Sequence, residues 1–304
     1  MARLLFAGIT AALLLPFDPA PFDTTQGAPG SQDRATFKSA ASTVHIYATV
    51  QGKDGRLVTN LTRDDFEVLD NNRPRPITVF DNTPQDITVA VMFDMSGSMA
   101  RQHPRIRAAA HALVNALWAK DRARIGSFGE EVAISPLLSS DKPTLIRIVN
   151  EELWPGGATP LWHATEVAMN SLDAEPGRRV VLLFTDGDDS GFLVPGSRKR
   201  VGEQAERGGF MVYAVGLEEN GLSDDMNDFA AGTGGGRFLV RPEDDLGRTF
   251  AQVVEELHHQ YVIGFSPEVL DGKSHKLTVR SRQPGMQVRS RRTYLANPET
   301  GGIR

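Results

Sequence analysis

The stretch that decides the fold is VMFDMSGSM, residues 91–99, in which an apolar segment ends in an acid and two hydroxyls. The apolar part extends back to Ile87, and a continuous run of this kind is typical of a parallel strand covered on both faces. In an extended chain, side chains at i, i+2 and i+4 point the same way. We therefore expect Asp94, Ser96 and Ser98 to converge just beyond the end of a buried strand.

Around this stretch, short apolar runs alternate with segments of helical periodicity. We expect helices near residues 108–117, 142–153, 161–172 and 250–257. The expected strands are 87–93, 124–128, an antiparallel edge strand at 132–134, then 180–184, 210–215 and 237–239. Strands and helices at this spacing predict a doubly wound, mostly parallel, Rossmann-like α/β sheet with helices on both faces, over residues 85–259.

The segments on either side of this domain have the alternation of β-strands and no helical periodicity. They comprise residues 43–84 before the domain and residues 260–296 after it. Because the two ends of a domain commonly lie close together, we expect the flanks to pack as one β-sandwich into which the α/β domain is inserted.

The N-terminus has the pattern of a secretory signal. Arg3 precedes an apolar run over residues 4–15, which Pro16 ends. A short positive region followed by such a run is typical of a signal peptide and is too short to span a bilayer. We therefore expect a signal peptide at 1–20, a linker rich in Pro, Gly, Ser and Thr at 21–42, and no transmembrane span after signal removal. Residues 297–304 read as a tail.

Composition excludes several classes of site and partner. Among 304 residues there is no cysteine, which rules out disulfides, thiolate metal sites and a cysteine nucleophile. The net charge of −5 argues against a general nucleic-acid binder. A basic cluster near the C-terminus reads either as a solvated strand face or as a surface for an anionic partner such as a membrane or polyanion. Its members are Lys273, Lys276, Arg280, Arg282, Arg289, Arg291 and Arg292.

The predicted sheet brings further polar residues to the same place. Ligand sites in doubly wound sheets lie beyond the carboxyl ends of strands, where the strand order reverses. Here the first and fourth strands should deliver Asp94 and Asp186 to one crevice, and the loop over 155–160 should place Thr159 above it. Together with Ser96 and Ser98 these residues form an all-oxygen set. Hard cations prefer oxygen ligands, so we expect Mg²⁺, with Mn²⁺ or Ca²⁺ as alternatives.

These residues resemble the metal-ion-dependent adhesion site of von Willebrand factor type A domains. The flanks "GRLVTNLTRDDFEVLDNN" and "QYVIGFSPEVLDGKSHKLTVRS" resemble exported bacterial proteins with this domain. The resemblance implies that Ser96, Ser98 and either Thr159 or an aspartate bind the metal directly, and that a carboxylate of a protein partner completes the shell. It also implies a location in the periplasm, on the cell surface or outside the cell. The sequence departs from the usual pattern at Ala158 and His163.

Two function classes are compatible with this sequence, and neither is an enzyme. One is an exported, metal-dependent protein-binding module; the other is a structural or assembly protein of the cell envelope whose β flanks bind while the metal only stabilises the fold. A serine hydrolase is disfavoured because a nucleophile elbow needs Gly-x-Ser-x-Gly, and Asp94 and Ala100 occupy glycine positions. We expect His258 and His259 to form a solvated helix end, or a cation favoured by the helix dipole at a C-terminus, rather than a metal pair.

Overall fold

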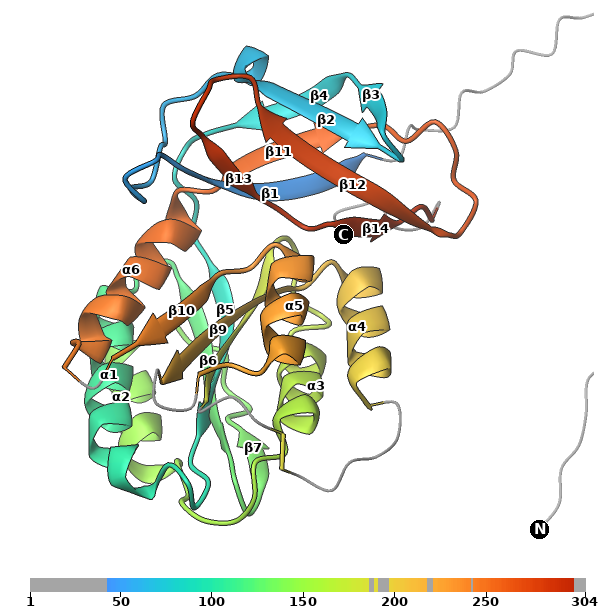
Figure 1. Ribbon diagram of the computed structural model, residues 1–304. Coiled ribbons are helices and arrows are strands. Elements are labelled where there is room, and N and C mark those ends of the chain that lie inside the picture. Colours follow the sequence, from blue (N-terminus) through green and yellow to red (C-terminus); the bar gives the residue numbers. More distant parts are fainter. Residues whose placement is uncertain (1–42, 186–188, 191–196, 218–220, 242, 298–304) are drawn as a thin grey trace, which may run out of the picture. The chain divides into compact units, whose positions relative to one another are not determined.

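The computed structural model describes residues 43–185, 189–190, 197–217, 221–241 and 243–297 (Figure 1). Its central element is a six-stranded sheet, in which all neighbours are parallel except the last pair. In spatial order the strands are β10 (Arg237–Val240), β9 (Met211–Leu217), β8 (Arg179–Thr185), β5 (Thr88–Asp94), β6 (Arg122–Phe128) and the antiparallel β7 (Val132–Ile134). The predicted fold class, including the antiparallel edge strand, is confirmed.

Helices cover both faces of this sheet, which explains why its central strands are apolar along their whole length. On β5, Val89, Val91 and Phe93 belong to one core, whereas Ala90 and Met92 belong to the core on the opposite face. The first core contains residues of helices α1 (His103–Ala116), α2 (Lys142–Glu151) and α6 (Leu246–His258). The 3₁₀ turn η2 (Ala100–Gln102) immediately precedes α1. The second core contains residues of helices α3 (Leu161–Ser171), α4 (Ser197–Gly208) and α5 (Asp224–Thr233).

The two flanks form two antiparallel sheets over one shared core (Figure 1). One sheet has the order β13-β1-β11-β4 and the other β14-β12-β2-β3, so each contains strands from before and after the α/β domain. Their bounds are β1 (Val44–Gln51), β2 (Phe66–Asp70), β3 (Arg73–Arg75), β4 (Ile77–Asp81), β11 (Tyr261–Phe265), β12 (Ser274–Ser281), β13 (Gln287–Arg289) and β14 (Thr293–Leu295), with the 3₁₀ turn η1 at Arg63–Asp65. The flanks are therefore parts of one β unit.

A buried polar cluster joins the end of α6 to this β unit. Glu256 accepts hydrogen bonds from Tyr213 of the central sheet (2.5 Å), from Thr49 of β1 (3.3 Å) and from Arg289 of β13. Gln260 donates to Thr49 and to Tyr213, at 3.1 Å each. These side chains connect the sheet, the helix and the flanks through direct hydrogen bonds.

The structure corrects one expectation about α6. His258 is not a solvated helix end, because its side chain is fully buried and its Nε2 lies 2.8 Å from Asp121 Oδ2. The imidazole also stacks on Trp118, with 3.6 Å between ring centroids. Only His259 is partly exposed.

Helix α4 is not among the helices expected from the sequence. Helix α4 is strongly charged and buries only Val201 and Ala205, so its apolar periodicity is weak. The turn between β2 and β3 consists of Asn71 and Asn72, both with positive φ, and Arg73 already begins strand β3. Among the described helices, none is both long and apolar enough to cross a membrane.

Candidate metal centre

The candidate site lies beyond the carboxyl ends of β5 and β8, which are neighbours in the sheet. The chain runs outward from β5 to β6 and β7, and then from β8 to β9 and β10 on the other side. The strand order therefore reverses between β5 and β8, where ligand sites of doubly wound sheets lie. The structure thus places the end of "VMFDMSGSM" at the topological switch point, as the sequence predicts.

Asp94 is the last residue of β5 and its side chain is fully buried. Its Oδ1 accepts a hydrogen bond from the Ser96 amide at 3.0 Å, and its Oδ2 accepts one from the Thr185 hydroxyl at 2.8 Å. A buried carboxylate is costly unless it is hydrogen-bonded or coordinates a cation. These two bonds orient the Asp94 carboxylate at the foot of the following loop.

The two serines of the loop meet in a turn rather than along an extended chain, because the Met99 amide donates to Ser96 O at 3.1 Å. Ser96 is buried and Ser98 is exposed, and their hydroxyl oxygens are 3.0 Å apart. Neighbouring ligands of an octahedral Mg²⁺ ion, at about 2.1 Å from the metal, are separated by about 3.0 Å. The spacing of these two hydroxyls therefore fits one edge of such a coordination shell.

A second loop, over residues 155–160, is bonded to the first through the backbone. The Gly156 amide donates to Met95 O at 2.8 Å, and the Gly97 amide donates to Gly157 O at 3.0 Å. Gly157 has φ +78°, and a Cβ there would lie 2.3 Å from Glu130 Cα. Only glycine fits that position without displacing backbone, so the loop is held closely against the residues that follow Asp94.

This loop ends in Thr159, which is buried at 3 % exposure. Its amide donates to the Ser190 hydroxyl at 3.1 Å, and its carbonyl accepts from the Ser190 amide at 3.2 Å. Asp189 accepts a hydrogen bond from the Leu161 amide at the start of α3 (3.0 Å). The chain after β8 is thereby joined to the Thr159 loop.

Four of the five predicted ligands are among the described residues, and Asp186 lies outside them. Within the described ranges, no group of three or more His, Cys, Asp or Glu side chains is placed to hold a metal ion. The predicted ligand set differs from such a group because three of its ligands are hydroxyls. Among the residues that the structure describes, Asp94 is its one acid. Its donors are oxygen only, which suits Mg²⁺, Mn²⁺ or Ca²⁺ better than the softer metals that prefer nitrogen or sulfur ligands.

Sequence reasoning missed three residues that support this arrangement. Thr185 orients Asp94, and Asp189 and Ser190 hold the Thr159 loop. Thr185 carries a weak signal in the sequence, because it is the first polar residue after the apolar run of β8. Asp189 and Ser190 carry no such signal, since their partners lie about thirty residues away along the chain.

Comparison with known proteins places the α/β domain in a family. A model of the von Willebrand factor type A domain matches residues 88–252. A solved structure described as von Willebrand factor type A from Catenulispora acidiphila aligns with a TM-score of 0.53 and 12 % identity, covering 85 % of this chain and 75 % of that chain. Comparison with the sequences of curated proteins gives no match.

Two further bacterial structures align with a smaller share of this chain. The von Willebrand factor domain of the type V pilus tip protein Mfa5 from Porphyromonas gingivalis aligns with a TM-score of 0.45 and 11 % identity, covering 57 % of this chain and 95 % of that chain. The PilB minor pilin from Streptococcus sanguinis aligns with a TM-score of 0.45 and 16 % identity, covering 62 % of this chain and 64 % of that chain. The family model spans more than half of the sequence, and the chain therefore belongs to the von Willebrand factor type A domain family.

Proposed function

We propose that this protein is an exported, metal-dependent protein-binding module. Its divalent cation, Mg²⁺ in the first place, would be held by Asp94, Ser96, Ser98, Thr159 and Asp186. The bound cation would supply a Lewis acid that accepts a carboxylate oxygen of a protein partner. Membership of a family whose domains mediate protein interactions supports a binding role.

The observation that carries this proposal is the geometry of the loop after β5. The Ser96 and Ser98 hydroxyls lie 3.0 Å apart beside a fully buried Asp94. A helix cap or turn would use one hydroxyl to satisfy a backbone amide, whereas here the two hydroxyls face each other. That arrangement offers two neighbouring neutral oxygens and a carboxylate to one hard cation.

The surface near the loop supports a protein as the partner. Ser98 is exposed, so a metal held there has one side open to a second molecule. Trp154 precedes the Gly156–Gly157 turn and is 66 % exposed. Exposed tryptophan is enriched among residues that dominate protein interfaces. We propose that Trp154 packs against the partner beside the acidic group that reaches the metal.

The experiment is a capture of proteins from the native envelope fraction on the purified protein, run with Mg²⁺ and with EDTA. We expect a partner retained only with Mg²⁺, and lost from Ser98→Ala bait. Trp154→Ala bait should lose the partner while keeping the response of its melting temperature to Mg²⁺. A partner retained equally in EDTA would overturn the proposal, and would favour the alternative in which the β flanks bind and the metal only stabilises the fold.

Export is part of the proposal and has its own test. The pattern of Arg3, the apolar run and Pro16 supports it, and residues 1–42 lie outside the described part of the chain. The N-terminal sequence of protein recovered from producing cells should begin between Pro16 and Ser42. Full-length protein confined to the cytoplasm would contradict export.

A further inference from the structure

An acidic side chain lies at the edge of the candidate metal centre, in the turn between β6 and β7. This residue, Glu130, is exposed. Gly157 packs directly on its backbone, since a Cβ on Gly157 would lie 2.3 Å from Glu130 Cα. The Gly157 carbonyl accepts the amide of Gly97, the residue between Ser96 and Ser98, at 3.0 Å. Glu130 is therefore connected through one residue, Gly157, to the loop that carries the predicted serine ligands.

The carboxylate of Glu130 lies on the same side as its backbone contact. A Cβ on Gly156 would be 3.2 Å from Glu130 Oε2, and the Gly156 amide donates to Met95 O, in the residue after Asp94 (2.8 Å). The Gly156 carbonyl also packs closely on Gly129, where a Cβ would lie 2.3 Å from it. These contacts keep the Glu130 side chain against the loop that closes over the candidate metal centre.

The charge of Glu130 is not used within the described part of the chain. Its side chain makes no ion pair or hydrogen bond with any residue that the structure describes. Glu131 is exposed as well and has no such partner among the same residues. Exposed carboxylates without partners are common and indicate no ligand by themselves. The place of these two beside the candidate metal centre is what gives their charge a consequence.

A carboxylate that approaches the metal from this side meets two like charges. Asp94 and Asp186 are expected to neutralise the divalent cation, so the occupied site has no excess positive charge to offset Glu130 and Glu131. Arg101, the first cation after Ser98 along the chain, makes no ion pair with either glutamate. Like charges repel at this range, and specific interfaces commonly use such repulsion against wrong partners. An isolated acidic side chain is therefore a poor match for this side of the centre.

A second feature of this edge favours a cation in the partner. Trp154 precedes Gly156 by two residues and is 66 % exposed. An arginine or lysine is attracted to the face of an indole and also pairs with a carboxylate. The unpaired Glu130 carboxylate against Gly156 and the exposed indole near it in the chain are thus both suited to a basic side chain.

We propose that the partner segment that reaches the metal carries both charges: an acid that binds the cation and, within about three residues or roughly 10 Å of extended chain, an arginine or lysine that pairs with Glu130. Glu130 then selects this segment over one whose acid stands alone. This inference rests on the proposed metal-dependent function and adds the charge that the partner must carry beside its acid.

The first test is a selection of short random peptides displayed on phage, captured on the purified protein with Mg²⁺ and released with EDTA. We expect the released peptides to be enriched in acids that have an arginine or lysine within three positions. Glu130→Gln bait should still enrich acids, but without the neighbouring base. Ser98→Ala bait should release no acidic peptides, because the metal is expected to be lost.

The second test measures the pairing itself. One peptide selected on the native protein is synthesised in two forms, with its basic residue and with glutamine in that place, and both dissociation constants are measured by calorimetry in Mg²⁺. Removing the base should weaken binding to the native protein about two- to fivefold, as for loss of one exposed ion pair. The same change in the peptide should leave its binding to Glu130→Gln unchanged.

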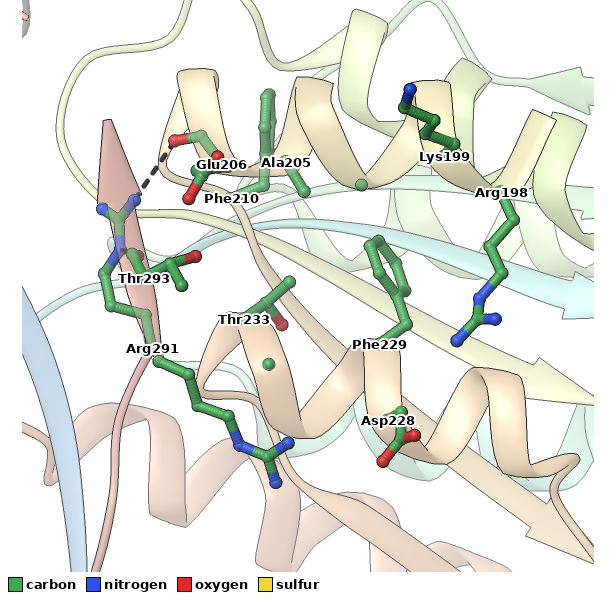
Figure 2. Close-up of a pocket in the computed structure, with 13 residues that line it drawn as sticks. Arg198, Lys199, Ala205, Glu206, Phe210, Asp228, Phe229, Thr233, Arg291 and Thr293 are labelled. Carbon is green, nitrogen blue, oxygen red and sulfur yellow. Dashed lines mark hydrogen bonds between the residues drawn. The ribbon is translucent and has the colours of Figure 1, made fainter. Parts of the chain in front are cut away.

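Two controls separate this role from other effects. Asp228→Asn should behave as the native protein does, because Asp228 is another exposed acid without a described ion pair. It lines a pocket of about 510 Å³ between α4 and α5, which none of the predicted metal ligands lines (Figure 2). Mn²⁺ binding, followed by electron paramagnetic resonance, should be the same in Glu130→Gln as in the native protein, since Glu130 is outside the proposed ligand set.

Each outcome decides the inference. Acids with a neighbouring base, selected by the native protein and not by Glu130→Gln, support it. Acids without a preference for a neighbouring base, or the same preference on Glu130→Gln bait, would overturn it while leaving the metal-dependent function intact. Loss of Mn²⁺ binding from Glu130→Gln would make Glu130 a metal ligand and would also overturn it. If the native protein releases no acidic peptides with EDTA, the metal-dependent function fails and this inference with it.

Discussion

Ser98 is the residue at which an effect on folding stability can best be distinguished from an effect on the proposed metal binding. Its side chain is exposed, and its hydroxyl contacts Ser96 rather than any part of the core. We predict that Ser98→Ala changes the free energy of unfolding without metal by less than about 0.5 kcal/mol, as for other exposed positions. The same change should abolish most of the rise in melting temperature that Mg²⁺ produces by binding the folded state.

Thermal melts with and without Mg²⁺ measure both effects. Ser140→Ala provides the control, because Ser140 is another exposed serine of the α/β domain and lies outside the candidate site. A Ser98→Ala protein that keeps the full Mg²⁺ response would remove Ser98 from the ligand set.

A second residue-scale prediction concerns Asp121 and pH. Burial opposes ionisation of Asp121, but hydrogen bonds with His258 and from the Ile87 and Trp118 amides hold its pKa below the usual value. A carboxyl whose pKa is lower in the folded state stabilises the protein above its unfolded pKa, about 3.9, and loses this contribution as the pH falls through the folded pKa.

Asp121→Asn should therefore lower the free energy of unfolding at pH 7 by about 1–3 kcal/mol. The difference in the free energy of unfolding between this variant and the native protein should become smaller as the pH falls from about 4 to about 2. Urea unfolding across this range measures it, with the nearby exposed Asp86→Asn as the control. A difference that stays constant from pH 7 to pH 2 would contradict the assignment.

At the scale of elements, the end of α6 depends on Glu256. This carboxylate is 3 % exposed and accepts hydrogen bonds from Thr49, Tyr213 and Arg289, which belong to three different strands. Removing one member of a buried ion pair leaves the other charge without a partner. We predict that Glu256→Ala lowers the free energy of unfolding by about 3–5 kcal/mol, measured by urea unfolding.

The adjacent residue provides a matched control for this prediction. Glu255 is exposed and pairs with His259 at 3.2 Å on the surface of the same helix. Glu255→Ala should lower the free energy of unfolding by no more than about 0.5 kcal/mol. Similar losses in the two variants would mean that the cluster around Glu256 does not hold α6 to the β unit.

The elements that the sequence predicts are those whose signals are local. Strands β5 and β8 follow from continuous apolar runs. The contact between Ser96 and Ser98 depends on the turn that follows β5, which spacing along an extended chain does not predict. The burial of His258 depends on Asp121, which lies 137 residues away, so the sequence near His258 contains no sign of it. Helix α4 escapes prediction for a related reason, because its charged surface leaves only two buried residues to mark a period.

At the scale of the whole molecule, the central question is whether the α/β domain and the β unit behave as one. Only His259 and Gln260 separate α6 from β11, and Gln260 is hydrogen-bonded to Thr49, Tyr213 and Arg178. These hydrogen bonds tie the end of α6 both to the central sheet and to the β unit.

A flexible Gly-Ser insertion after Gln260 should separate the two units. Calorimetry should then show two unfolding transitions in place of one, because the insertion disrupts the shared polar cluster. The same insertion after Asp54, in an exposed hairpin of the β unit, should leave a single transition. A single transition in both variants would mean that the units remain coupled through other contacts.

The proposed function depends on a cation bound at the end of β5. The most direct measurement is a titration with Mn²⁺ followed by electron paramagnetic resonance, which reports the free ion. We predict that the native protein binds one Mn²⁺ per chain, that Mg²⁺ displaces it, and that the folded Asp94→Asn variant does not bind it. Unchanged Mn²⁺ binding by Asp94→Asn, or no binding by the native protein, would contradict the account.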